Sequence, residues 1–296
     1  MKLSRNQFDV LTTLERNGAA SQRELAARIG RSVGTINKTL NELRALKLLD
    51  DKGITQAGVD ALEPYRVKRA VFIAAGFGSR LVPITLNTPK PLVRVNGVRI
   101  IDTLLDAVTA AGIEEIYIIR GYLSEQFDQL LYKYPGIRFI ENPVYNESNN
   151  ISSVMCARYL LKNAYVLEGD LFLYNPGLIC KYQYASNYLG MKVDKTDDWC
   201  FLTTGGYISK LQIGGTDCHH MYGISYWNAE DGARMSSHIK EVYEQPGGKE
   251  RFWDQVPLEY HLSDYRIGVR ECTSSDIVEI DTFRELKMLD PTYGKA

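Results

Sequence analysis

Residues 70–92 combine glycines, an arginine and a lysine directly after an apolar run. The run Val71–Ala75 has the composition of a buried parallel strand, and two glycines follow it closely. Glycines after a strand let backbone N–H groups approach a polyphosphate, because no Cβ intervenes. Arg80 and Lys90 can then balance negative charge that the backbone dipoles only partly neutralise. The stretch therefore predicts a phosphate-binding site, although its spacing fits neither the dinucleotide-binding nor the P-loop pattern.

Carboxylates further along the chain are candidates for holding a divalent cation. A strand is expected over 165–173, and Asp170 follows its apolar part, Tyr165–Leu167, where a carboxylate would lie at a strand's carboxyl end. Glu279 and Asp281 bracket one residue, and strand alternation sends both side chains to one face. Close carboxylates repel each other unless a cation or hydrogen bonds compensate. Beside a phosphate loop, Asp170 predicts a Mg2+ ligand, whereas spacing alone favours a solvated face for Glu279 and Asp281.

Alternating strands and helices would position these groups. Strands are expected at 117–121 and 138–142, and helices at 100–111 and 123–133. This alternation predicts a doubly wound, mainly parallel sheet with ligands at the carboxyl ends of its strands. After Asp170 the pattern changes to antiparallel strands. It then predicts helices at about 229–244 and 250–262 and closes with a strand leading into a helix.

The first 66 residues have a different organisation. A helix over 4–16 is followed by a second helix capped by Ser21 and a third capped by Ser32, with Gly30 in the turn between them. A short hairpin around Gly53 and a closing helix complete a pattern that resembles the winged helix-turn-helix domains of bacterial regulators. The third helix and the residues just before it present polar and basic side chains outward, and these types can reach phosphates and base edges. They are Arg31, Ser32, Thr35, Asn37 and Lys38. Duplex DNA binding and protein contact or dimerisation both remain open for this segment.

Length and composition fit two domains, at 1–66 and 67–296, joined by a short linker. The 296-residue chain has a formal net charge of −1, so nothing global indicates a nucleic acid or membrane partner. Residues 1–66 carry a small basic excess, with 11 Lys and Arg against 8 Asp and Glu. Five scattered cysteines without a C-x-x-C pair suit reduced thiols and a cytoplasmic location. No long apolar span predicts membrane insertion.

Two motifs carry a closer resemblance. The run Ala74-Ala75-Gly76-Phe77-Gly78-Ser79-Arg80 and the segment Thr85–Leu92 resemble the signature of nucleotidyltransferases that make nucleoside-diphosphate sugars and alcohols. Residues 69–290 resemble the bacterial CTP:phosphocholine cytidylyltransferases. The matching runs are "AAGFGSR", "GYLSEQF", "NNIS", "GISYW", "FWDQVPLEY" and "EIDTF".

The resemblance implies a Rossmann-like α/β domain with a mixed, mainly parallel sheet, preceded by the small, mainly α winged helix domain. It implies transfer of CMP from CTP to phosphocholine, giving CDP-choline and pyrophosphate, with Mg2+ on Asp170 and Asp281. Arg80, Lys90 and Asp170 would be catalytic. Nucleotide contacts would come from the glycine run 74–80 and from Gly121, Tyr122, Asn149, Asn150 and Ser152. The choline group would be held by Trp199, Trp253, Asp254 and Glu279, because a quaternary ammonium binds through ring faces and carboxylates.

Two other functions remain open. Glu168-Gly169-Asp170 stands where D-x-D is often found, which concerns the geometry of the metal site. Pro89 and Pro91 make the lysine segment closer to the sugar enzymes, which concerns the substrate. The acceptor could therefore be a sugar 1-phosphate or an aminoalkyl phosphonate. A transcription regulator that only senses a nucleotide or phosphocholine is the alternative from another class, although a sensor needs no complete catalytic set. In each case we expect a homodimer with no membrane partner.

Overall fold

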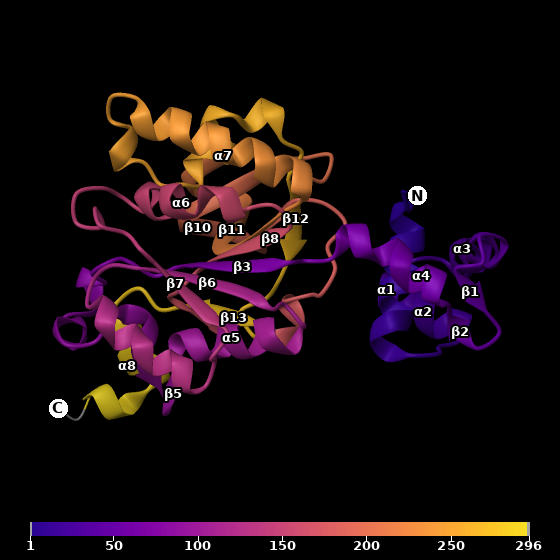
Figure 1. The fold of residues 1–296 in the computed structure, drawn as a ribbon, viewed down its shortest axis with the longest axis horizontal. Coiled ribbons are helices and arrows are strands. Elements are labelled where there is room, and N and C mark those ends of the chain that lie inside the picture. Colours follow the sequence, from indigo (N-terminus) through magenta and orange to yellow (C-terminus); the bar gives the residue numbers. More distant parts are fainter. Residues whose placement is uncertain (1, 295–296) are drawn as a thin grey trace. The chain divides into compact units, whose positions relative to one another are not determined.

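The computed structural model describes residues 2–294 and separates them into two compact units (Figure 1). The smaller unit holds residues up to Arg66 together with Tyr182–Tyr184, and the larger holds Val67–Lys181 and the residues from Ala185 onward. The helices are α1 (Arg5–Asn17), α2 (Gln22–Ile29), α3 (Val33–Ala45), α4 (Gln56–Leu62), α5 (Ile100–Ala110), α6 (Ile151–Ala157), α7 (Ala229–Glu244) and α8 (Phe283–Leu289). No helix in the described part of the chain is long and apolar enough to span a membrane.

The smaller unit is built from α1 to α4 and a two-stranded hairpin, β1 (Leu49–Asp50) and β2 (Gly53–Ile54). Ser4 and Ser21 each form a capping box at a helix start, and the Ser32 hydroxyl accepts from the Thr35 N–H to begin α3. Gly30 ends α2 in the left-handed conformation, which favours glycine. The local signals in the sequence therefore place these helix ends where the structure has them.

The larger unit is organised around a seven-stranded sheet with the order β10-β12-β11-β8-β3-β6-β7. Its strands are β3 (Arg69–Ile73), β6 (Glu115–Arg120), β7 (Ile137–Glu141), β8 (Ala164–Glu168), β10 (Asn187–Thr204), β11 (Tyr207–Trp227) and β12 (Gly268–Glu271). Two small two-stranded sheets pair β4 (Arg94–Val95) with β5 (Val98–Arg99), and β9 (Leu171–Leu173) with β13 (Ile277–Glu279). Strand β3 pairs in parallel with β6 on one side and β8 on the other, whereas β11 joins β8 antiparallel. The expected mixed, mainly parallel sheet is confirmed.

Helices cover both faces of this sheet, with α6 and α7 on one side and α5 and α8 on the other (Figure 1). Alternation along β3 explains the two cores. Ala70 and Phe72 belong to the core that contains the buried face of α5, and Val71 and Ile73 to the core that contains α6 and α7. Because β3 is buried on both faces, its sequence is a continuous apolar run rather than an alternating one.

Two expected elements differ from the structure. The single strand expected over 165–173 is two strands, because Glu168-Gly169-Asp170 ends the pairing of β8 with β3, and β9 then pairs with β13. The helix expected over 250–262 is replaced by a π-helical turn at Val256–Tyr260 with 3-10 turns on either side. Pro257 has no N–H to donate to a regular helical ladder, and the His261 N–H instead bonds the carbonyl of Val256.

Candidate functional site

A cavity of about 560 Å³ lies where β3 and β8 end in the larger unit. The chain turns from β3 towards β6 on one side and later returns to β8 on the other, so the loops after the two neighbouring strands diverge here. Ligands of doubly wound sheets bind in the crevice that such a switch point creates. The cavity is therefore the candidate functional site.

The structure brings most of the sequence-predicted residues of the larger unit to this cavity. Its lining includes Ala74, Ala75, Gly76, Gly78, Ser79, Arg80, Lys90, Asn149, Asn150, Ser152, Asp170, Trp199, Asp254, Glu279 and Asp281. Four predicted residues lie outside the lining: Phe77, Gly121, Tyr122 and Trp253. Phe77 and Tyr122 pack against each other at 4.7 Å between ring centroids, and the Tyr122 hydroxyl donates to the carbonyls of Thr85 and Leu86. They therefore support the glycine loop and the segment that leads to Lys90.

Gly78 shows why the loop needs glycine. Its φ of +63° lies in the left-handed region, and a Cβ built there would lie 2.9 Å from the Cβ of Lys90. The Thr85 hydroxyl donates to the Gly78 carbonyl at 2.9 Å and fixes the loop against the lysine segment. A side chain at this position would push the loop away from Lys90, so the glycine sets the position of the lysine.

Lys90 is the centre of the charged part of the site. Its ammonium donates to Asp170 Oδ2 at 2.8 Å and to Asp281 Oδ1 at 2.9 Å, and its side chain is only 9% exposed. Burial opposes its positive charge, but Asp170 and Asp281 outweigh burial and raise the pKa of Lys90 above its ordinary value. Arg80 also pairs with Asp281, at 2.9 Å. One ammonium thus holds together two carboxylates that are far apart in the sequence.

Oxygen atoms suitable for a hard cation lie beside this lysine. One carboxylate oxygen each from Glu168, Asp170 and Glu279 falls within 4.8 Å of the others. Asp170 Oδ1 is buried and has no hydrogen-bond partner among the described residues. An orphaned carboxylate oxygen among other carboxylates is a place that a divalent cation can fill.

Two of these carboxylates, Glu168 and Glu279, also form an acidic wall of the cavity together with Asp254. Burial, followed by repulsion from Asp254 and other carboxylates, raises the pKa of Glu168 well above its ordinary value, and burial and Asp170 do the same to the pKa of Glu279. Burial raises the pKa of Asp254 to about 6, although the hydrogen bond from the Tyr188 hydroxyl at 2.5 Å opposes the shift. This acidic wall is therefore costly to ionise unless a cation approaches it.

Asn150 links the two sides of the cavity. Its Oδ1 accepts from the backbone N–H of Trp253 at 2.8 Å, and its Nδ2 donates to Glu168 Oε1 at 3.2 Å. A backbone N–H can only donate, so the amide oxygen must face Trp253 and the amide nitrogen is left for Glu168. The backbone N–H of Asn149 donates to the Lys249 carbonyl, and its Nδ2 donates to the Glu250 carbonyl. The run 149–152 thus joins the loop after β7 to the segment that carries Asp254.

The aromatic residues predicted for the acceptor separate into two groups. Trp199 lines the cavity and meets Phe252 edge-on, at 5.7 Å between ring centroids. Trp253 is 1% exposed and packs between Tyr188 and Trp227 in the core, so it offers no ring face to the cavity. One of the two tryptophans predicted for the acceptor therefore lines the cavity, and the lining holds more carboxylates than the sequence predicts.

Several lining residues were not predicted, among them Glu168, Asp198, Tyr145 and Phe252. Glu168 had a signal, since it occupies the first acidic position of the strand-end motif that Asp170 completes. Gly223, in the predicted run "GISYW", leaves room for it, because a Cβ there would overlap the Glu168 carboxylate. Asp198 lines the cavity together with the predicted Trp199, whereas Phe252 lines it in place of the predicted Trp253.

The residues predicted for DNA contact lie at the start of α3 in the smaller unit. Arg31, Ser32, Asn37 and Lys38 are exposed and Thr35 is half-buried. Asn37 donates to Gln22 of α2 at 3.1 Å, and the Arg31 guanidinium reaches Asn6 at 3.4 Å. The start of α3 therefore presents polar and positively charged side chains at the surface of this unit.

Residues 69–187 match the family described as Nucleotidyl transferase, and residues 2–53 match the MarR family. A 2-aminoethylphosphonate cytidylyltransferase of Lancefieldella rimae is 36% identical over 228 residues, covering 76% of this chain and 92% of the relative. A choline-phosphate cytidylyltransferase of Streptococcus pneumoniae is 30% identical over 223 residues, covering 75% of this chain and 96% of the relative. The solved CTP:phosphocholine cytidylyltransferase from Streptococcus pneumoniae superposes with a TM-score of 0.71 at 30% identity, covering 77% of this chain and 99% of its own.

The acidic wall predicts a pH-dependent cost in stability. The pKa of Asp254 in the folded chain is about 6, above the unfolded value, so the folded chain holds the proton more tightly. This preference adds fully to the free energy of unfolding below about pH 4, and it is lost as the pH rises through 6. Asp254→Asn keeps an oxygen for the Tyr188 hydroxyl but cannot ionise. Between pH 4 and 7.5 we expect the free energy of unfolding of the variant to gain roughly 2–3 kcal/mol relative to wild type. Denaturant unfolding followed by tryptophan fluorescence measures this, since all three tryptophans lie in the larger unit.

Asp197→Asn is the matched control, because the Asp197 side chain is 93% exposed. Its stability difference from wild type should not change over the same pH range. A pH-independent difference for Asp254→Asn would show that this carboxylate titrates alike in the folded and unfolded chains, contrary to the burial seen here.

Proposed function

The chain belongs to the cytidylyltransferases of the nucleotidyltransferase family, and we propose that it transfers CMP from CTP to a small aminoalkyl phosphonate, with 2-aminoethylphosphonate as the foremost candidate. The observation that carries this proposal is the acidic wall of Glu168, Asp254 and Glu279 in the same cavity as Lys90 and Asp170. Partly or fully buried carboxylates favour a cationic ligand, which restores their ionised form. A primary ammonium also donates N–H hydrogen bonds, which carboxylates accept strongly.

In the proposed reaction an oxygen of the acceptor phosphonate forms a bond to the α-phosphorus of CTP. The bond from that phosphorus to the oxygen bridging to the β-phosphorus breaks, and pyrophosphate leaves. No general base is required, because the acceptor oxygen is already anionic. Since two anions must approach each other, the protein contributes mainly positioning and charge neutralisation.

The charged residues divide these tasks. The backbone N–H groups of the glycine run and the Arg80 guanidinium are suited to the departing pyrophosphate. Lys90 is suited to the charge that develops on the α-phosphate and on the acceptor oxygen. Its bonds to Asp170 and Asp281 keep the ammonium in one position before substrates arrive. The carboxylates of the acidic wall would orient the amine end of the acceptor.

The carboxylates beside Lys90 also fit Mg2+, which we propose as the cofactor. Asp170 fits most directly through its orphaned buried Oδ1, and Glu279 and Glu168 supply further oxygens within 4.8 Å. Asp281, which the family resemblance implies as the second ligand, pairs with both Lys90 and Arg80 through Oδ1, so Oδ2 would be the atom that it offers to the ion. When bound, the ion would neutralise phosphate charge and hold the phosphate oxygens in place.

Phosphocholine is the second candidate acceptor. Trp199 and Phe252 line the cavity and offer aromatic surface, and the Streptococcus pneumoniae relative is a choline-phosphate enzyme. Two observations favour the phosphonate instead. Trp253 lies in the core, which leaves the site richer in carboxylates than in ring faces. The Lancefieldella rimae relative, a 2-aminoethylphosphonate enzyme, is more similar to this chain.

We expect 2-aminoethylphosphonate to have the highest kcat/KM in a pyrophosphate-release assay with CTP and a panel of acceptors. Phosphocholine should be at least about tenfold poorer, because a charge-assisted hydrogen bond that it cannot make contributes about 1.5–3 kcal/mol. Asp254→Asn should raise the KM for the aminoalkyl acceptor and leave the KM for CTP nearly unchanged, because Asp254 belongs to the acidic wall but not to the carboxylates placed around Mg2+.

Other outcomes assign the acceptor differently. If phosphocholine is preferred and Trp199→Ala raises its KM about thirtyfold, as removal of a desolvated cation–π interaction predicts, the second candidate replaces the first. Preference for glucose 1-phosphate over every amine would contradict a cation-binding acidic wall altogether.

We also propose that the smaller unit binds duplex DNA, as a dimer of the chain. Support comes from the match of residues 2–53 to the MarR family and from the exposed Arg31, Asn37 and Lys38 at the start of α3. These side chains carry the donors and the positive charge that phosphates and base edges require. Dimerisation would present two such helices to two half-sites.

A gel-shift assay of the full chain on the DNA upstream of its own operon tests this proposal. We expect a shift whose affinity falls steeply with salt. Arg31→Ala/Lys38→Ala should make the plot of log affinity against log salt less steep, by roughly one unit of slope for each phosphate that is no longer neutralised. Lys195→Ala/Lys240→Ala removes the same charge from the larger unit and should bind as wild type does. If no salt-sensitive shift is seen, a protein-contact role replaces DNA binding, and a shift that neither pair of substitutions changes would contradict the assignment to the start of α3.

A further inference from the structure

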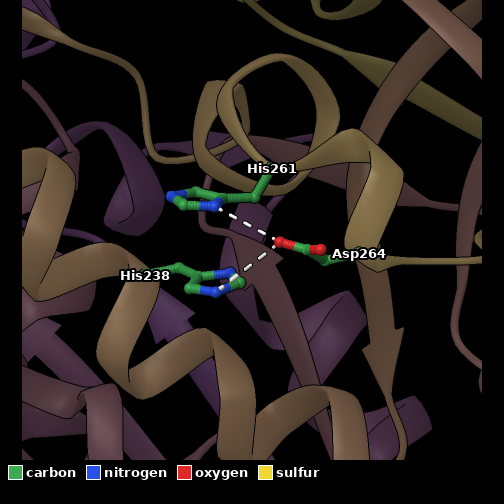
Figure 2. Close-up of side chains that lie close together, drawn as sticks. All are labelled: His238, His261 and Asp264. Atoms are coloured by element: carbon green, nitrogen blue, oxygen red, sulfur yellow. Dashed lines mark ion pairs between the residues drawn. The ribbon is translucent and has the colours of Figure 1, made fainter.

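A second cluster of residues that can ligate a metal lies outside the cavity. It is formed by α7 and by the segment that follows the π-helical turn Val256–Tyr260. Its residues are His238, His261 and Asp264, none of which lines the cavity (Figure 2). The two imidazole rings are stacked, with centroids 3.7 Å apart and planes at 11°, and the Asp264 carboxylate faces both (Figure 2). We propose that these three side chains form a binding site for a divalent transition-metal ion such as Zn2+.

The spacing of the three ligand atoms suits one ion. Asp264 Oδ2 lies 3.8 Å from His238 Nε2 and 3.5 Å from His261 Nδ1. Zinc binds nitrogen and carboxylate oxygen at about 2.0–2.2 Å, so ligand atoms around a tetrahedral ion lie roughly 3.4 Å apart. A closing movement of a few tenths of an ångström brings Asp264 within range of both imidazoles. Because an imidazole binds an ion in its ring plane, loading also turns the stacked rings about their Cβ–Cγ bonds.

The outer nitrogen of His238 already has a hydrogen-bond partner, as metal-ligating histidines usually do, and the outer nitrogen of His261 lies near a carboxylate. His238 Nδ1 lies 2.9 Å from the Tyr265 hydroxyl, and His261 Nε2 lies 3.7 Å from Glu241 Oε2. These contacts leave His238 Nε2 and His261 Nδ1 directed towards Asp264. The arrangement therefore provides two of the features of a metal site, a set of converging ligand atoms and a shell that orients them.

The donor set selects the class of ion. Two imidazoles and one carboxylate suit Zn2+ and its neighbours in the transition series, whereas Mg2+ prefers oxygen ligands alone. Three protein ligands leave a fourth position for water, and Asp264 is exposed at this edge. The sequence carries the pattern as His238-x-x-Glu241 on α7 and His261-x-x-Asp264 after the π-helical turn.

Such an ion would tie α7 to the segment that carries part of the acidic wall. His261 follows the π-helical turn Val256–Tyr260, which begins two residues after Asp254. The Arg234 guanidinium on α7 already donates to the Asp264 backbone carbonyl, so the two segments are held together before an ion binds. The ion therefore has a structural role, independent of which acceptor the enzyme uses.

Zn2+ titration of the full chain in saturating Mg2+ tests the site, because Mg2+ occupies oxygen-only sites and leaves imidazoles available. We expect binding by calorimetry and a rise in the thermal unfolding midpoint, followed by tryptophan fluorescence, of roughly 5 °C or more at about a hundred times Kd. His238→Gln, His261→Gln and Asp264→Asn should each weaken Zn2+ binding by about a hundredfold or more. Glu241→Gln and Tyr265→Phe, which change only the outer partners, should weaken it about tenfold.

His219→Gln/His220→Gln is the matched control, since it replaces the chain's two other histidines and should keep the full Zn2+ response. Asp264→Asn is a nearly isosteric substitution at an exposed position, so it still tests the site if a histidine variant fails to fold. The proposal is overturned if Zn2+ gives no response above Mg2+, or if Zn2+ affinity is the same in all three ligand variants as in wild type.

Discussion

The ammonium of Lys90 lies between two carboxylates, Asp170 and Asp281, that are far apart in the sequence, and the geometry of the cavity depends on that contact. Asp170 follows β8, and Asp281 lies just beyond β13, yet both accept a hydrogen bond from the same nitrogen. Without the ammonium, two partly buried carboxylates would face each other in a region of low dielectric constant. Gly78 makes the contact possible, since its missing Cβ lets the loop after β3 approach the lysine stem. The same charges that fix the fold here are the ones that phosphoryl transfer requires.

The acidic wall has the opposite energetic character. Glu168, Asp254 and Glu279 are held where burial and mutual repulsion disfavour their charge. A fold selected only for stability would place apolar residues there, as it does for the neighbouring Trp253 and Tyr188. Retention of three carboxylates beside a phosphate-transfer centre is the feature that a cationic acceptor explains. Asn150 connects this wall to the loop after β7, so one hydrogen-bonded residue links the two sides of the cavity.

The fold is largely predictable from the sequence, because the residues that begin and end its helices and strands act over short distances along the chain. The serine caps, Gly30 and the apolar run of β3 each determine structure within a few residues, and the glycine, arginine and lysine pattern located the cavity. Long-range packing decided what was missed. Whether Trp253 or Phe252 faces the cavity depends on a turn whose geometry is set by Pro257 and by core packing against Tyr188. Glu168 was missed because its neighbours Asp254 and Glu279 reach it only through tertiary structure.

The most direct test of the central claim is a double-mutant cycle of Lys90→Met and Asp170→Asn, with kcat/KM measured by pyrophosphate release from CTP. If the ammonium and the carboxylate act as one unit, each single variant loses about a thousandfold in rate, and the double variant loses little more than the worse single one. Lys133→Met, which removes a lysine paired with Asp106 on the surface of the same unit, should retain wild-type turnover. Near wild-type turnover of Lys90→Met or Asp170→Asn with the circular dichroism spectrum unchanged, or fully additive losses in the double variant, would contradict the account.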